Sequence, residues 1–240
     1  MAGPVEIIIP VYNEGANILR TLDEIEDKVG HPHSILVVYD FEEDDTLPPL
    51  RGWMERPGAP KVRLVRNHFG RGALNAIRSG FKEAKEDLCL VCMGDLSDDM
   101  TVVADMIRKM DEGCDIVCGS RYMKGGRQIG GPWFKGMLSR IAGITLHRLA
   151  GVPTHDATNS FKMYRRSLLE RLTIESSGGF EIGMEIVVKA HLLGCRIAEV
   201  PSTWRDRSGG ESKFRLFKWL PSYLRWYFQA FTARPASEGA

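Results

Sequence analysis

Asp95 is the residue whose surroundings most clearly indicate chemistry. It follows residues 88–93, an apolar run without helical spacing, which predicts a buried strand. In an open α/β sheet, a carboxylate at the C-terminal end of a strand faces the crevice where ligands bind. Carboxylate oxygens suit Mg²⁺ or Mn²⁺ carrying a diphosphate, because these cations take oxygen ligands and leave positions for phosphate. Asp98 and Asp99 follow closely, so a solvated turn with helix-capping acids is the alternative.

Two further predicted strands also end in polar residues. After the first strand, Tyr12 can cover a nucleobase and Glu14 can bind ribose or base donors, while Asn13 is placed to cap a helix. Asp40 holds the same kind of position after the second strand. Residues 66–72 form a glycine-bearing turn before a helix, which can admit phosphate or sugar closely. The plain alternatives are a strand-to-helix turn and a loop acid among solvated neighbours.

The second half of the chain holds candidates for handling phosphates and an acceptor. Arg121 directly follows a predicted strand, where its guanidinium could grip phosphate. Asp156 could orient an acceptor or act as a general base, with Glu181 and Glu185 as alternatives. Residues 204–213 gather three cations around a Gly-Gly pair and could close over a diphosphate or an acceptor phosphate. In isolation these segments also fit a surface arginine, a capping aspartate and a solvated loop.

Alternating strands and helices are needed to bring these side chains to one edge. In the first half, strands are predicted at residues 5–11, 34–39, 61–65, 88–93 and 115–119, helices at 13–29, 70–85 and 100–110, and a loop at 41–49. This alternation implies parallel pairing with right-handed crossovers. The second half is expected to complete the same sheet, with helices at residues 133–149 and 183–193, strands at 159–164 and 196–200, and a mobile glycine-rich loop at 124–131.

Composition limits the function further. The 240 residues are 43% hydrophobic and 26% charged, an ordinary globular balance, and the net charge of +1 argues against a mainly electrostatic nucleic-acid binder. Four of the five cysteines lie in or beside apolar runs with zinc-like spacing. Because alternate strand side chains face opposite ways, we expect buried reduced thiols in a cytosolic protein instead. No uncharged apolar window of about 20 residues exists, so no membrane-spanning helix is expected.

The order and spacing of these motifs resemble the family 2 inverting glycosyltransferases, and within them the dolichyl-phosphate (polyprenyl-phosphate) mannosyltransferase branch. The resemblance covers residues 5 to about 214, and it rests on Pro10, Tyr12, Glu14, Asp40, Gly70, Gly72, Gly94, Asp95, Gly119, Ser120, Arg121, Asp156, Ser160, Phe161, Lys162, Glu185, Arg207, Ser212 and Lys213. It implies a GT-A fold, an α/β architecture whose Rossmann-like, mostly parallel central sheet is flanked by helices. It also implies a nucleotide-diphospho-sugar donor and a divalent metal, Mg²⁺ or Mn²⁺.

The resemblance guides the assignment of roles. We assign nucleotide-sugar binding to Pro10, Tyr12, Glu14, Asp40, Arg66, Gly70, Gly94, Asp95 and Lys213. We assign the catalytic roles to Asp95, which would also hold the metal, and to Arg121, Asp156 and Arg207. We assign the acceptor side to Ser139, Arg140, Asn159, Ser160 and Glu185. The usual Asp-x-Asp is Met93-Gly94-Asp95 here, so one carboxylate is missing, and Asp98 and Asp99 are the residues that could compensate.

The expected activity is inverting transfer of a hexose, with mannose favoured, to a polyprenyl or dolichyl phosphate. GDP-mannose and UDP-glucose both remain open as donors. A lipid phosphate is already ionised and needs no strong base, whereas a saccharide hydroxyl would need one, for which Asp156 is the choice. The alternatives are a glycosyltransferase of polysaccharide synthesis, a nucleotidyltransferase, and a catalytically weak nucleotide-sugar binding protein.

The chain is expected to form one GT-A domain over residues 1–214, with a nucleotide-sugar half at 1–122 and an acceptor half at 123–214. Residues 215–231 mix aromatic and basic side chains, which suits an amphipathic helix in a membrane interface. A core or oligomer helix is the alternative. Residues 232–240 are expected to form a disordered tail. We expect a cytoplasmic protein, with attachment to the cytoplasmic membrane face and oligomer formation as open questions.

Overall fold

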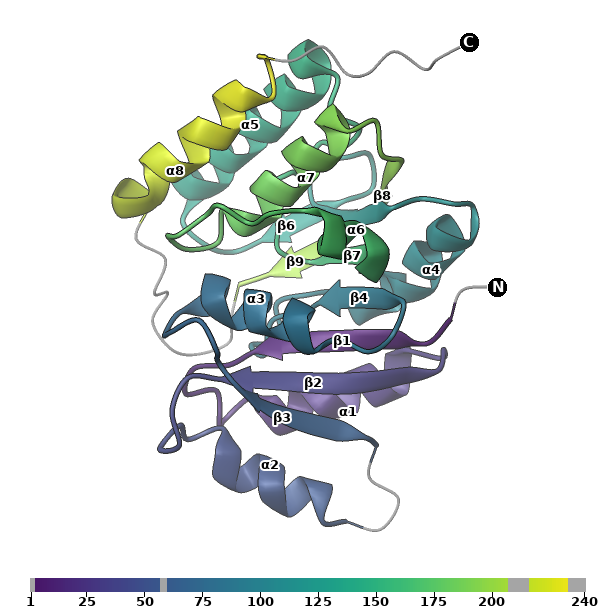
Figure 1. The fold of residues 1–240 in the computed structure, drawn as a ribbon, viewed down its shortest axis with the longest axis vertical. Helices are drawn as coiled ribbons and strands as arrows, with labels where there is room; N and C mark the ends of the chain where they lie inside the picture. The colour runs from purple at the N-terminus through teal and green to yellow at the C-terminus, as the bar shows by residue number, and fades with distance from the viewer. Residues whose placement is uncertain (1–2, 57–59, 207–215, 233–240) are drawn as a thin grey trace.

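A central β-sheet carries the fold of the computed structural model (Figure 1). The structure describes residues 3–56, 60–206 and 216–232. Within these residues the main sheet has seven strands in the order β3-β2-β1-β4-β7-β5-β8, and a second sheet pairs β6 with β9. The strands are β1 (Val5–Pro10), β2 (His33–Tyr39), β3 (Val62–Arg66), β4 (Leu88–Val91), β5 (Ile116–Ser120), β6 (Arg127–Ile129), β7 (Lys162–Arg165), β8 (Ile197–Pro201) and β9 (Thr203–Arg205).

The main sheet is parallel except at one strand. β7 runs antiparallel to both of its neighbours, β4 and β5, whereas β1, β2, β3 and β4 pair in parallel, as do β5 and β8. β1 is buried along its whole length, as expected of a strand covered on both faces. The C-terminal ends of β1, β2, β4 and β5 therefore meet at one edge, where the sequence places its candidate carboxylates. The mostly parallel α/β sheet confirms the predicted fold class.

Helices cover both faces of the sheet (Figure 1). Residues of α1 (Ile18–Lys28), α2 (Leu47–Met54) and α4 (Val103–Asp111), together with a 3₁₀ turn (Met100–Val102), bury their apolar sides against one face. Residues of α3 (Ala73–Glu83), α6 (Arg166–Arg171) and α7 (Ile182–Leu192) pack on the other. α5 (Trp133–Ala150) and α8 (Leu216–Gln229) lie side by side beyond α7, joined by a hydrogen bond from the Tyr227 hydroxyl to Thr145 Oγ1.

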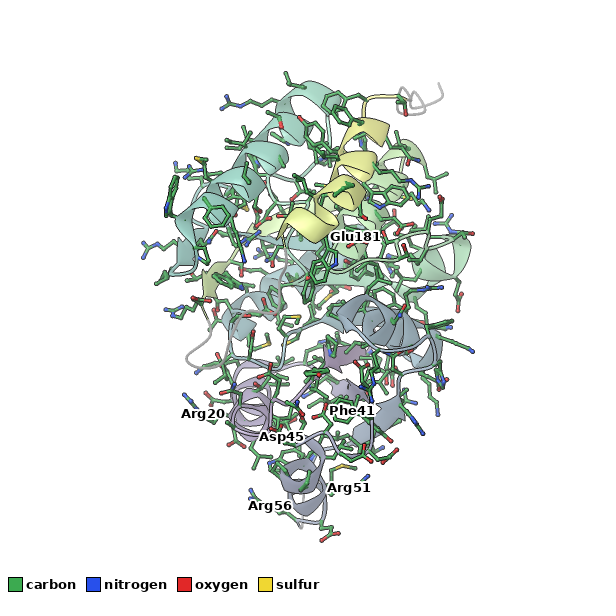
Figure 2. All side chains as sticks on the ribbon, turned by 90° about the vertical axis from the view of Figure 1, so that its left-hand side faces the viewer. Arg20, Phe41, Asp45, Arg51, Arg56 and Glu181 are labelled. Carbon is green, nitrogen blue, oxygen red and sulfur yellow. The ribbon has the colours of Figure 1, made fainter. Side chains whose placement is uncertain are left out.

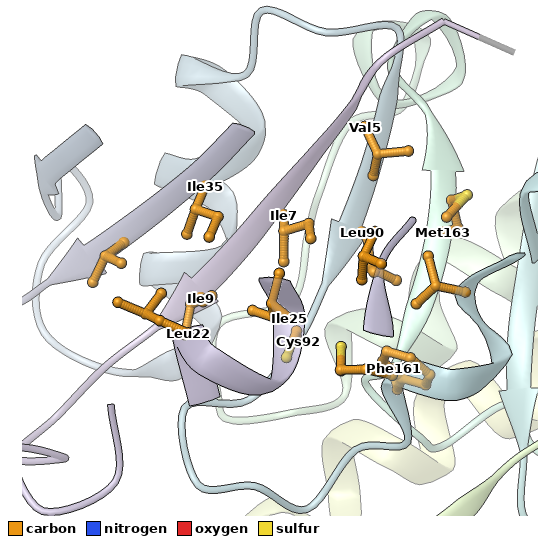
Figure 3. Packing of buried hydrophobic residues seen from close by; sticks show 14 of the residues in the cluster. Val5, Ile7, Ile9, Leu22, Ile25, Ile35, Leu90, Cys92, Phe161 and Met163 are labelled. Atoms are coloured by element: carbon orange, nitrogen blue, oxygen red, sulfur yellow. The ribbon is translucent and has the colours of Figure 1, made fainter. Parts of the chain in front are cut away.

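The period of two along β1 divides its side chains between two cores. Ile7 and Ile9 join the cluster that contains Leu22 and Ile25 of α1 (Figure 3), whereas Ile8 belongs to a cluster on the opposite face. All of these residues are fully buried. Because each fully buried aliphatic side chain contributes about 1.5–3 kcal/mol, this packing holds the strand ends rigidly in place.

The predicted helix cap at Asn13 is wrong. Asn13 adopts a left-handed conformation with φ 55°, and α1 begins only at Ile18. The backbone N–H of Asn13 donates to the Asp44 carboxylate at 3.1 and 3.2 Å, and that of Glu14 donates to Thr46 Oγ1 at 2.9 Å. The segment after β1 is therefore fastened to the segment after β2, more than thirty residues away.

Two predicted loops contain regular structure. The loop expected at residues 41–49 ends early because α2 begins at Leu47, with prolines in its first turn, where proline is favourable. In the glycine-rich stretch 124–131, β6 pairs in parallel with β9.

The cysteines are free thiols, with Cys89 and Cys92 in separate core clusters. The described residues contain no group of three or more His, Cys, Asp or Glu side chains that could hold a metal.

Within the described ranges, none of the helices is both long and apolar enough to span a membrane. α8 occupies most of the segment predicted to be an amphipathic aromatic helix. Predictions that involve Arg207, Lys213 and the tail after residue 232 fall outside the described residues.

Candidate active site

A cavity of about 830 Å³ opens at the edge where the parallel strands end. Figure 2 views the molecule from that side, with Phe41 toward one end of the site and Glu181 toward the other. One wall carries polar side chains from the strand ends, and the opposite wall is formed by α5, α8 and residues 178–180. A single cavity therefore joins the nucleotide-sugar half and the acceptor half that the sequence predicts.

Pro10, Tyr12, Glu14 and Asp40 line one end of the cavity. Asp40 is largely buried because its carboxylate bridges two segments: Oδ1 accepts from Asn67 Nδ2 at 2.7 Å, and Oδ2 accepts from the Gly72 N–H at 2.9 Å. These bonds hold the turn before α3 against the end of β2.

Asp95 and Asp98 form an acidic pair in the middle of the cavity, each 7% exposed. Asp95 Oδ1 accepts from the Ser97 N–H at 3.1 Å, and Asp98 Oδ2 accepts from the Met93 N–H at 2.8 Å. The pKa of Asp98 is raised to about 7, first by burial and also by the negative charge of Asp95, against the lowering effect of the Met93 N–H.

This acidic pair fits a divalent cation. The raised pKa of Asp98 reflects first its burial and then the negative charge of Asp95, and a cation bound by both carboxylates would offset both effects. Donor phosphate oxygens would supply further oxygen ligands of the kind that Mg²⁺ and Mn²⁺ accept. Of the two acids predicted to compensate for the missing first acid of Asp-x-Asp, Asp98 lines the cavity with Asp95. Asp99 does not, because it accepts bonds from Thr101 and Thr203.

Asp156 forms an ion pair with Arg121; the arginine lines the cavity, whereas the aspartate lies behind it. The Arg121 Nε donates to Asp156 Oδ2 at 2.7 Å and its Nη2 donates to Oδ1 at 2.9 Å, while Nη2 also reaches Ser139 Oγ at 3.1 Å. This two-pronged geometry fixes the plane of the guanidinium. Burial lowers the pKa of Arg121, but the Asp156 charge outweighs it and the net pKa is raised, so the cation is permanent.

Asp156 is poorly suited to act as a base. It is fully buried, and its oxygens also accept from the Arg121 N–H, Thr158 Oγ1 and the Asn159 N–H. Burial raises its pKa, but the charge and hydrogen bonds of Arg121 prevail, so the net pKa is lowered. A carboxylate with a lowered pKa and occupied oxygens binds a proton weakly, which makes Asp156 a positioning residue for Arg121.

The two glutamates considered as alternative bases accept hydrogen bonds from backbone N–H groups instead. Glu181 accepts from the N–H groups of Gly178 and Gly179 at 2.8 and 2.6 Å. Glu185 accepts from those of Glu175 and Ser176 at 2.6 and 2.9 Å, and it also pairs with Lys189. Both glutamates are fully buried. They fix residues 175–180, the end of which forms part of the cavity wall.

The opposite wall is apolar and continues onto the surface. Trp219, Leu220, Tyr223 and Tyr227 of α8, together with Phe180 and Met184, line the cavity. Leu138, Ile141 and Leu224 line it too, yet each is more than 40% exposed. Trp133 and Met137 of α5, Phe228 of α8 and Phe231 just after α8 are also exposed. An apolar surface thus runs from the inside of the cavity to the outside of the molecule.

The family of the chain follows from comparison with known proteins. Residues 6–173, well over half of the chain, match the model of the family described as glycosyl transferase family 2. The chain belongs to glycosyl transferase family 2. The dolichol-phosphate mannosyltransferase of Pyrococcus furiosus is 31% identical over 226 residues, which cover 92% of this chain and 62% of that protein. The undecaprenyl-phosphate 4-deoxy-4-formamido-L-arabinose transferase of Serratia proteamaculans is 26% identical, covering 89% of this chain and 64% of that protein.

Solved structures of other proteins share the fold of this chain. Glucosyl-3-phosphoglycerate synthase from Mycobacterium tuberculosis in complex with UDP matches with a TM-score of 0.71 and 16% identity, covering 98% of this chain and 82% of that one. A mannosyltransferase from Pyrobaculum calidifontis in complex with GDP-mannose and Mn²⁺ matches with a TM-score of 0.66 and 20% identity, covering 95% and 64%. This family 2 chain therefore has the GT-A fold. It spans less than two thirds of the length of the curated relatives named above.

The structure brings together most, but not all, of the residues that the sequence singled out in this family 2 chain. The cavity is lined by Pro10, Tyr12, Glu14, Asp40, Asp95, Arg121, Ser139, Asn159 and Ser160. Among the described residues, Arg66, Gly70, Gly94, Arg140, Asp156 and Glu185 do not line it. Gly94 is buried beneath Glu14, and Arg66 and Arg140 are exposed.

Sequence reasoning missed Lys135 and Arg71. Lys135 lines the cavity one helical turn before Ser139, and both side chains face the cavity that Arg121 also lines. The spacing of four residues between Lys135 and Ser139 on a predicted helix was the available signal. Arg71 lines the opposite end, within the turn at residues 66–72 that was predicted to admit phosphate or sugar, but its side chain was not singled out.

Proposed function

We propose that the chain transfers a hexose, with mannose favoured, from a nucleotide-diphospho-sugar to a polyprenyl phosphate, with inversion at the anomeric carbon. One observation carries the proposal: a single cavity runs from carboxylates at the strand ends, past Arg121, to an apolar wall that reaches the surface. A charged diphosphate and an apolar chain can therefore occupy the same site.

The relatives support this choice of substrates. The names of the Pyrococcus furiosus and Serratia proteamaculans proteins indicate transfer to dolichol phosphate and undecaprenyl phosphate. Two of the fold neighbours were crystallised with Mn²⁺, together with GDP-mannose or with UDP and a glucosyl product. These names agree with the chemistry that the cavity offers.

The mechanism follows from the charges in the cavity. Asp95 and Asp98 would hold a divalent cation, which neutralises charge on the departing diphosphate. Arg121, fixed by Asp156, would present a preorganised positive charge to the reacting phosphates. Lys135 and Ser139 lie on the α5 side of Arg121 and would bind the acceptor phosphate. Because a lipid phosphate is ionised near neutral pH, no base is needed, in keeping with the structural tasks of Asp156, Glu181 and Glu185.

The apolar wall suits the lipid part of the acceptor. Leu138, Ile141 and Leu224 connect the cavity to exposed aromatic residues such as Trp133 and Phe228. An isoprenoid chain leaving the cavity along this route would stay in apolar contact until it entered a bilayer. The outer faces of α5 and α8 would then lie in the membrane interface, where aromatic residues are favourable.

A transfer assay tests the proposal. The protein is incubated with radiolabelled GDP-mannose or UDP-glucose, Mn²⁺ and a polyprenyl phosphate, and the organic phase is analysed for glycolipid. We expect a lipid-soluble product that requires both the cation and the lipid phosphate, and that Asp95→Ala and Asp98→Asn abolish. Sugar transfer only to saccharide hydroxyls would favour a role in polysaccharide synthesis, and nucleotide binding without any transfer would favour a binding protein.

A further inference from the structure

Glu199 is a largely buried carboxylate that is not among the described residues lining the cavity, and only 11% of its side chain is exposed. It belongs to β8, which pairs in parallel with β5, the strand that leads directly to Arg121. Residues 154–156, here called the linking segment, contact both Glu199 and Arg121. Glu199 can therefore reach Arg121 through this segment without touching a substrate.

The Glu199 carboxylate holds two successive residues of the linking segment. Its Oε2 accepts from Thr154 Oγ1 at 3.1 Å and from the His155 N–H at 2.8 Å, and its Oε1 lies 2.6 Å from His155 Nδ1. Thr154 Oγ1 in turn accepts from the Asp156 N–H at 3.1 Å. Thr154 and Asp156 are fully buried. A chain of hydrogen bonds thus runs from Glu199 through the Thr154 hydroxyl to the residue that fixes Arg121.

The linking segment also receives α5. A Cβ at Gly143 of α5 would lie 2.0 Å from the His155 carbonyl oxygen, so glycine is needed for the helix to approach this closely. The rings of His147 and His155 lie against each other, with centroids 3.9 Å apart and planes at 34°. Because α5 also carries Ser139, whose Oγ accepts from Arg121 Nη2, the linking segment sets where Arg121 lies relative to this helix.

We propose that Glu199 is a positioning residue for Arg121 that acts through Thr154 and Asp156. The proposal rests on the proposed function, in which Arg121 stabilises charge on the reacting phosphates. Loss of the carboxylate would release the linking segment, and a displacement of about 1 Å in a group that acts on the reacting atoms can lower the rate by about 10²-fold. The nucleotide is held by other residues, so its binding would be kept.

Initial-rate kinetics of the full chain, with the nucleotide sugar varied at saturating polyprenyl phosphate, test the proposal. Glu199→Ala should lower kcat by about 10²-fold and change the KM for the nucleotide sugar by less than about twofold, as expected when an interaction made only in the transition state is lost. Glu199→Gln keeps one acceptor oxygen and should lose less. An unchanged kcat in Glu199→Ala, or a loss that lies only in this KM, would overturn the proposal.

Two threonine variants test the route through the linking segment. Thr154→Val removes the hydroxyl that joins Glu199 to Asp156 and should lower kcat as Glu199→Ala does, whereas Thr154→Ser keeps the hydroxyl and should retain the wild-type kcat. The double variant Thr154→Val, Glu199→Ala should be no slower than the slower single variant, because residues that act as a unit have non-additive effects. Losses that multiply would show two independent effects and overturn the proposal.

Glu6→Gln is the matched control for the loss of a buried carboxylate. Glu6 is 1% exposed, accepts from Arg63 Nη2 and from the Lys85 N–H, and is not among the described residues that line the cavity. Its substitution should lower the melting temperature and leave kcat unchanged. A loss of kcat in Glu6→Gln as large as that in Glu199→Ala would show that kcat follows stability alone, and the proposal would fail.

The ¹⁵N NMR signal of Arg121 Nε provides a readout that needs no activity. This N–H donates to Asp156 Oδ2 at 2.7 Å, and its signal is assigned by its absence from Arg121→Lys. Glu199→Ala and Thr154→Val should shift the signal, and Glu6→Gln should not. An unshifted signal in Glu199→Ala would refute the proposal whatever the substrates are. A shifted signal, in a protein whose wild type transfers no sugar to polyprenyl phosphate, would refute the proposed function alone.

Discussion

Arg121 and Asp156, which are 35 residues apart, form a buried two-pronged ion pair at the floor of the cavity. Asp156 is fully buried, and only 12% of the Arg121 side chain is exposed. Such a pair fixes the direction of a cation better than it stabilises the fold, because desolvation offsets most of the attraction. Removing one partner, however, leaves the other charge buried without compensation.

Asp156→Asn should therefore destabilise the protein by about 3–5 kcal/mol while keeping the shape of the side chain. Urea denaturation at pH 7 measures this change. Arg121→Met and the double variant complete a double-mutant cycle, in which we expect the double variant to be more stable than Asp156→Asn alone. A coupling free energy near zero would show that the two residues act independently.

The pH dependence of the same pair has a definite sign. The pKa of Asp156 is lowered in the folded protein, so its contribution is present above the unfolded value of about 4 and is lost as the pH falls through the folded value. The difference in stability between wild type and Asp156→Asn should therefore shrink below about pH 4. A difference that stays constant down to acid unfolding would contradict this assignment.

Asp98 should affect the pH dependence of stability in the opposite direction to Asp156 in metal-free protein. Its folded pKa of about 7 exceeds the unfolded value of about 4, so the folded state binds a proton more tightly and stability falls as the pH rises between these values. Asp98→Asn should remove this loss of stability at high pH. We expect its melting temperature, measured in EDTA, to exceed that of the wild type at pH 8 and to match it near pH 4.

The same substitution should weaken cation binding. Mn²⁺ with nucleotide should raise the melting temperature of the wild type, because a ligand that binds only the folded state stabilises it. This increase should be much smaller for Asp98→Asn. Parallel pH profiles of the two proteins in EDTA, or equal stabilisation by Mn²⁺, would exclude Asp98 from the acidic pair described here.

The sequence was sufficient where local pattern decides structure. The apolar runs of β1 and β4 predicted buried strands, and their polar ends predicted the position of Asp95 and Glu14 at the cavity. Prediction from the sequence failed where hydrogen-bond partners are distant in the chain. Asn13 has the composition of a helix cap, but its backbone is held by Asp44, and no local signal reveals that bond.

The role of Asp156 shows the same limit. Its residue type permits a base, a metal ligand or a partner of a cation, and only the position of Arg121 across the sheet decides among them. β7 was predicted as a strand, but its antiparallel direction depends on the path of the chain over more than forty residues after β5. The segment 47–54 was missed because two prolines indicate a loop unless they fall in a first helical turn.

Membrane attachment through α5 and α8 should depend on the exposed aromatic side chains near the cavity. Trp133→Ser and Phe228→Ser should each reduce flotation with anionic liposomes, because they remove apolar area from the face proposed to enter the interface. Leu149→Ser is the matched control: Leu149 is 71% exposed and Trp133 is 76% exposed, but Leu149 lies near the other end of α5. If Leu149→Ser reduces flotation as much as Trp133→Ser, the attachment is not confined to this face.

Gly179 sets how closely Trp219 of α8 packs on residues 178–180 in the apolar wall of the cavity, here called the acceptor wall. A Cβ at this position would lie 2.3 to 2.5 Å from three ring atoms of Trp219, so Gly179→Ala must displace that ring, which lines the cavity. We expect the KM for the polyprenyl phosphate to rise by about tenfold, which corresponds to about 1.4 kcal/mol of lost apolar contact with the acceptor. The KM for the nucleotide sugar should not change, because the donor end is built from other elements.

Initial-rate kinetics with each substrate varied in turn measure the two KM values separately. Gly30→Ala provides the control, because a Cβ at Gly30 would meet no atom within 4 Å. A rise in both KM values would indicate that Gly179→Ala disturbs the whole fold rather than the acceptor wall. An unchanged acceptor KM would mean that Trp219 does not contact the acceptor, and the apolar wall would then have to be assigned another role.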